Sequence, residues 1–164
     1  MGNKRPIELF MPPNMLKAKV GGGLGGADVA AMKRAELAME ELKSEFPGWI
    51  AEDVKKLMDA RTRYSQVPDD ASCAAALLRT AHDIKGQAPT FHFPLIARVA
   101  ASLSRLIGER PAGTTIPVTL VDAHVNAIQV IHKLAIQDIN DRTAQALCAE
   151  LDARVDEVLK TAKT

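Results

Sequence analysis

The segment Leu77–Phe93, LLRTAHDIKGQAPTFHF, decides the fold. At about 100° per residue, its apolar side chains and one residue before it share one face of a helix: Ala74, Leu77, Ala81, Ile84 and Ala88. His82 projects about 130° from the centre of this stripe by the same arithmetic. The segment therefore predicts an amphipathic helix with its imidazole on the solvent side.

Five residues lie one and two turns from His82: two are small, two are basic and the fifth is a leucine, namely Ala75, Gly86, Arg79, Lys85 and Leu78. A neutral imidazole is a good nucleophile near pH 7. To accept a phosphoryl group it needs an open in-line approach and fixed donors for the equatorial oxygens. Gly86 removes a side chain that would block the approach, and Lys85 and Arg79 can reach the phosphate oxygens from three residues on either side.

The pattern H-x-x-K-G, His82 to Gly86, resembles the signature of histidine-containing phosphotransfer domains of two-component phosphorelays. The continuation Thr90-Phe91-x-Phe93 is similar to the phosphotransfer domains of chemotaxis-type histidine kinases. The resemblance covers about residues 46–160 in architecture and 78–106 in motif. It implies His82 as phosphoacceptor, Lys85 as phosphate stabiliser and Gly86 as the access position.

The chain departs from this family at Pro89 and His92, where members commonly carry glycine. A proline removes one backbone donor and clashes with the carbonyl four residues earlier, here that of Lys85. We therefore expect the helix to kink or end near Ala88, with a consequence for how Lys85 is presented and for the transfer rate.

The composition indicates packed helices. Of 164 residues 47% are apolar and only 4% aromatic, which favours an all-α protein over a sheet sandwich. The net charge of +1 and the scarcity of aromatic platforms argue against nucleic-acid binding. Without a signal-peptide pattern or a long apolar run, we expect a soluble cytoplasmic protein that does not bind membranes. Cys73 and Cys148 are expected to be reduced thiols, and Cys148 to lie in the core.

Residues 1–27 are predicted to form an extended flexible tail, because they contain three prolines and the glycine run 21–26. Residues 28–164 are predicted to form a single helical domain. Its expected helices are 28–45, capped by Asp28, and 50–64, then the helix with His82 from about 70, and 94–108, 117–137 and 144–158. Breaks are expected at 46–49, 68–70, 109–116 and 138–141.

Short connections between six helices predict an antiparallel up-and-down four-helix bundle with an additional flanking helix. The bundle is expected to comprise residues 50–137, with the first and last helices alongside. An alternative places the last helix within the bundle itself.

The other histidines have structural explanations. His124 and His132 lie near the apolar stripe of one helix, but eight residues of helix span about 12 Å, too far for one metal ion. His92 suits a turn that needs a left-handed residue. The sequence contains no P-loop and no kinase-like nucleotide loop. The candidate nucleophiles Ser102 and Ser104 belong to no hydrolase motif.

The sequence thus predicts a phosphocarrier rather than an enzyme, with no ATP site, cofactor or metal of its own. A receiver domain of a response regulator and a hybrid sensor histidine kinase are the expected partners, with magnesium supplied by the receiver. We expect Arg79 to bind phosphate and Arg98, Ser102 and Arg105 to contribute to docking. The oligomeric state stays open.

Two other functions remain. In a helical adaptor, His82 is incidental and partner binding does not need it. In a haem or metal-binding helical bundle, ligands come from the four histidines, His82, His92, His124 and His132.

Overall fold

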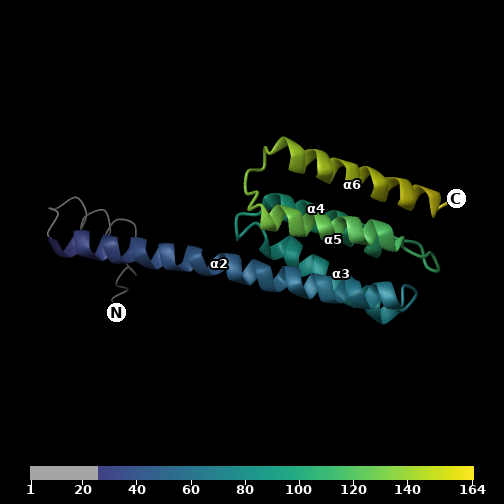
Figure 1. Cartoon of the computed structure of the whole chain (residues 1–164), viewed down its shortest axis with the longest axis horizontal. Coiled ribbons are helices and arrows are strands. Elements are labelled where there is room, and N and C mark those ends of the chain that lie inside the picture. Colours follow the sequence, from purple (N-terminus) through teal and green to yellow (C-terminus); the bar gives the residue numbers. More distant parts are fainter. Residues whose placement is uncertain (1–25) are drawn as a thin grey trace, which may run out of the picture. The chain divides into compact units, whose positions relative to one another are not determined.

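The computed structural model describes residues 26–164, without the side chains of residues 27 and 42–47. This range is all-α: it contains five helices and no strand. They are α2 (Gly26–Gln66), α3 (Ala71–Gln87), α4 (Pro94–Gly108), α5 (Val118–Lys133) and α6 (Arg142–Thr161) (Figure 1). The predicted tail lies outside the described residues, apart from residues 26 and 27.

The predicted break at 46–49 is wrong, because α2 continues through these residues. The two helices expected at 28–45 and 50–64 are therefore one, and Asp28 lies inside it rather than at its cap. Inside a helix, a proline removes one backbone hydrogen bond and clashes with the carbonyl four residues earlier. Pro47 is such an interior residue, yet α2 continues past it to Ile50, where burial of the following segment begins.

The chain divides into two compact units, 1–44 and 45–164, and the boundary falls within α2. In the described part of the first unit, the large apolar side chains are exposed rather than buried. Met32 is 55% exposed and Met39 is 59% exposed.

The second unit contains the core. Its central helix is α4, which packs against α3, α5 and α6, while α6 also packs against α5. The C-terminal part of α2 adds Ile50, Val54, Leu57, Ala60 and Tyr64 to the same buried cluster. Because α4 has three helical neighbours, little of its surface reaches solvent.

Polar contacts fix the C-terminal part of α2 against the following segments. The hydroxyl of Tyr64 donates to the Ile116 carbonyl at 3.3 Å, and burial raises the pKa of this hydroxyl. Arg61 Nε lies 2.5 Å from Asp122 Oδ1 on α5. One face of this segment lies in the core, since Ile50, Leu57 and Tyr64 are fully buried.

Several predicted helix ends are confirmed. Asp70 caps α3, because its carboxylate accepts a hydrogen bond from the Cys73 backbone N–H at 2.9 Å. Pro94 occupies the first turn of α4, which ends at Gly108 as expected. In the same way, Asp141 caps α6 by accepting from the Ala144 backbone N–H at 2.8 Å.

Both cysteines are free thiols, and Cys148 is buried as predicted. Among the described helices, none is both long and apolar enough to traverse a lipid bilayer.

Candidate functional site

The helix α3 presents His82 to solvent. Its buried positions are Ala74, Leu77, Ala81 and Ile84, which are four of the five residues of the predicted stripe; the fifth, Ala88, is the buried C-cap residue. His82 follows buried Ala81 directly and is exposed. Within the described range its ring nitrogens have no hydrogen-bond partner. The imidazole is therefore available to a reactant from outside.

His82 lies on the wall of an open groove of about 550 Å³ between α3 and α4. Six residues of α3 and four from α4 and its C-terminal end line this groove: Ala75, Leu78, Arg79, His82, Asp83, Lys85, Ala101, Ser104, Arg105 and Glu109. The groove thus brings together three cationic side chains and two carboxylates around one imidazole.

Two of the cations come from the same helix as the histidine. Arg79 and Lys85 precede and follow His82 by three residues, and both are exposed. Neither forms an ion pair with another described residue. These two side chains are thus free to meet an anion that enters the groove.

The third cation, Arg105, comes from α4 and has partners already. Its Nη2 lies 2.6 Å from Asp156 Oδ1 on α6, and its Nε lies 3.7 Å from Glu109 Oε1. The hydrogen bond with Asp156 raises the pKa of Arg105 above its ordinary value.

Packing within the described structure does not require glycine at position 86. A Cβ built at this position meets nothing within 4 Å. Its backbone is helical, and glycine in a helix is less favourable than alanine by about 0.5–1 kcal/mol. The space beside Gly86 is therefore unoccupied by the chain itself.

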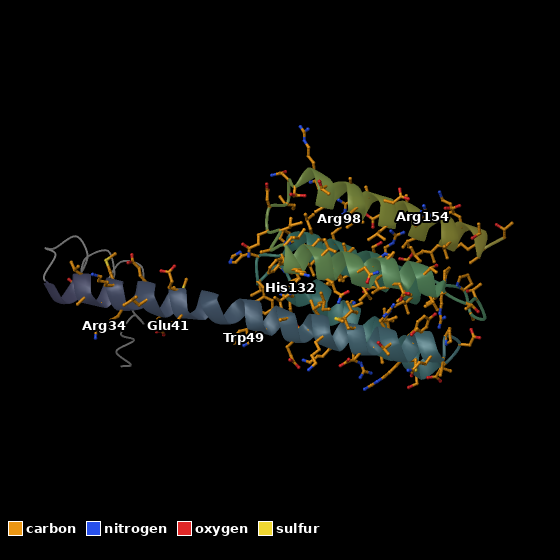
Figure 2. All side chains as sticks on the ribbon, viewed as in Figure 1. Arg34, Glu41, Trp49, Arg98, His132 and Arg154 are labelled. Carbon is orange, nitrogen blue, oxygen red and sulfur yellow. The ribbon has the colours of Figure 1, made fainter. Side chains whose placement is uncertain are left out.

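Of the residues expected at the docking surface, one is buried and another is exposed outside the groove. Ser102 is buried, with its hydroxyl 3.1 Å from Nε2 of His124, so that expectation was wrong. Arg98 is exposed but does not line the groove; its Nη2 lies 3.0 Å from Asp152 Oδ2 on α6 (Figure 2).

The turn after α3 sets how α4 returns beside it. As predicted, α3 ends before Pro89, at Gln87, and the Phe93 N–H donates to the Ala88 carbonyl at 2.9 Å. His92 adopts the expected left-handed conformation, with φ of 63°.

Both phenylalanines of this turn point into the protein. Phe93 packs edge-on against the ring of His132, and Phe91 packs edge-on against Trp49. These contacts join the turn between α3 and α4 to α5 through His132 and to α2 through Trp49.

Of the remaining histidines, His124 has the structural position expected of it. His124 is fully buried and satisfied at both nitrogens: Nδ1 lies 2.7 Å from the Leu120 carbonyl, and Nε2 contacts Ser102. Burial lowers the pKa of His124. Across residues 26–164, no three His, Cys, Asp or Glu side chains gather closely enough to hold a metal ion.

Sequence reasoning did not single out Ala101, Ser104 and Glu109 as groove residues. Ala101 shares one face of α4 with Ser104 and Arg105, which follow it by three and four residues. This spacing of two small residues and a cation was the sequence signal that could have indicated the α4 side of the groove.

A scan against family models, a search of curated proteins and a search of solved structures all find no match to this chain.

Proposed function

We propose that the chain is a histidine phosphotransfer protein. It accepts a phosphoryl group on His82 and passes it to or from the aspartate of a response-regulator receiver domain. The observation that carries this proposal is the single exposed imidazole in a groove with two unpaired cations, Arg79 and Lys85. The open space beside Gly86 supports it, because that space can admit the residue that delivers the phosphoryl group.

The proposed fold fits this role. The C-terminal part of α2 with α3, α4 and α5 forms an up-and-down four-helix bundle, and α6 is the flanking helix. The support is that consecutive helices are joined by short segments and that α6 packs against α4 and α5. The C-terminal part of α2 shares the buried core.

In the transfer step, an unprotonated ring nitrogen of His82 attacks the phosphorus of a phosphoaspartate in line. The N–P bond forms while the bond from phosphorus to the carboxylate oxygen breaks, and its electron pair stays on the aspartate. No proton has to leave the attacking nitrogen. Negative charge spread over the equatorial oxygens is met by the ammonium of Lys85 and the guanidinium of Arg79. The reverse transfer uses the same contacts.

The phosphoryl group comes from a partner, since the sequence has no nucleotide-binding loop. A hybrid sensor histidine kinase supplies it through a receiver domain. The magnesium ion that neutralises charge in phosphoryl transfer belongs to the acidic site of that receiver.

The test is incubation with a receiver domain charged by acetyl phosphate. We expect acid-labile, alkali-stable label on the wild-type chain and none on His82→Gln. The matched control is His92→Asn, which removes another exposed histidine and keeps a residue type that tolerates a left-handed backbone; it should label normally. Label that persists in His82→Gln refutes the proposal, and receiver binding without any label favours the adaptor.

A further inference from the structure

Arg105 contacts two parts of the protein, the groove of His82 and the helix α6. It lines the groove of His82, and its guanidinium is also bound to Asp156 on α6 at 2.6 Å. Arg79 and Lys85, the other cations of the groove, have no such partner in the described part of the chain. Arg105 is therefore the one groove cation whose charge is shared with a second helix.

The ion pair that holds Arg105 is exchangeable. The side chains of Arg105 and Asp156 are 42% and 48% exposed, and ion pairs with this much solvent contact are weak. Glu109 adds only a longer contact of 3.7 Å. A phosphoryl group carries up to two negative charges and three acceptor oxygens, which arginine binds more strongly than a single carboxylate.

We propose that Arg105 exchanges Asp156 for the phosphoryl group on His82, so that Asp156 is a positioning residue that tunes the phosphotransfer equilibrium. This inference rests on the proposed function. In the unphosphorylated chain Asp156 holds the guanidinium toward α6. After phosphorylation, Arg105 joins Arg79 and Lys85 around the phosphoryl oxygens.

Thermodynamic linkage makes the coupling reciprocal. If phosphorylation draws Arg105 away from Asp156, then removal of the Asp156 charge must favour the phosphorylated state. Because the ion pair is weak, the shift is small: about two- to fivefold in the equilibrium. The same reasoning gives α6 a response to phosphorylation, since one of its two ion pairs with α4 is released.

The structure supplies a matched control. Arg98 and Asp152 form the other ion pair between α4 and α6, at 3.0 Å and with comparable exposure. Asp152 precedes Asp156 by one helical turn, but Arg98 does not line the groove. Asp152→Asn therefore removes the same kind of contact between the same helices without breaking an ion pair of a groove cation, although the Asp152 charge also acts on Arg105 without direct contact.

The first experiment measures the equilibrium between phosphohistidine on this chain and phosphoaspartate on a receiver domain charged with acetyl phosphate. Asp156→Asn should move it toward phosphohistidine by about two- to fivefold, and Asp152→Asn should move it less, because Asp152 acts on Arg105 without pairing with it. Arg105→Gln should move it the other way, and Asp156→Asn should have no further effect in that background. Thermal unfolding of each variant checks that the fold is retained.

The second experiment observes Arg105 directly. The chain is phosphorylated with phosphoramidate, a small phosphodonor, and the side-chain Nε–H signals of Arg105 and Arg98 are followed by NMR. The Arg105 signal should shift on phosphorylation and the Arg98 signal should not. A wild-type chain that takes no label on His82 refutes the proposed function, and this inference with it. Normal labelling with an unmoved Arg105 signal, or with equal equilibria in Asp156→Asn and Asp152→Asn, overturns this inference alone.

Discussion

Substitution of Gly86 by alanine should separate stability from phosphotransfer. Gly86 is the penultimate residue of α3, and a Cβ placed there meets no atom within 4 Å. Alanine has a higher helix propensity than glycine and should fit here without a clash. It should therefore stabilise the fold by about 0.5 kcal/mol. This is less than the gain expected in the middle of a helix, because Gly86 is near the end of α3. The melting temperature should rise by about 2 °C.

The same methyl group should slow transfer. It enters the space through which a receiver domain must bring its aspartate to His82, and a displacement of about 1 Å in a reacting pair can cost up to 10²-fold in rate. We expect a loss of about tenfold or more in the rate of label transfer from a charged receiver domain. Stability is measured by thermal unfolding followed by circular dichroism on the same preparations.

Gly48 provides the control. It is also helical and exposed, and a Cβ there also meets nothing within 4 Å, but it belongs to α2, none of whose described residues lines the groove. Gly48→Ala should stabilise the fold by about 0.5–1 kcal/mol and leave transfer unchanged. If Gly86→Ala transfers label at the wild-type rate, Gly86 does not provide access to His82. If its melting temperature is lower than that of the wild type, the space beside Gly86 does not accommodate a methyl group.

Three further predictions concern stability and charge. Burial lowers the pKa of His124 in the folded chain. Below about pH 6.5, His124 therefore binds a proton in the unfolded chain but stays neutral in the folded chain. The free energy of unfolding should then fall by up to about 1.4 kcal/mol per pH unit, and urea titrations of His124→Asn should show a flatter pH dependence. Asp141→Ala removes the cap on α6 and should cost about 1 kcal/mol in urea unfolding, whereas Asp141→Asn should cost little. Lys85→Met should slow transfer about tenfold with unchanged melting, because one donor to the phosphoryl oxygens is lost; an unchanged rate contradicts its role.

Local features of the site were predictable from the sequence because they depend on one helix. The face of α3 follows from helical periodicity, so the exposure of His82 and the burial of Ile84 could be inferred from spacing alone. The end of α3 before Pro89 follows from proline's missing donor. The break at 46–49 failed because the proline rule ignores the packing that begins at Ile50.

Features that involve two helices were not predictable, because they depend on how α4 is rotated and on how many neighbours it has. The sequence analysis expected Ser102 at the docking surface, but α4 packs against α3, α5 and α6, and the Ser102 hydroxyl lies beside His124 in the interior. The consequence is chemical as well as structural. Once most of α4 is covered, its two arginines lie on the narrow strip that remains, and both pair with α6. Only Arg105 also reaches the groove, so the charge around His82 depends on a carboxylate about 70 residues further along the chain.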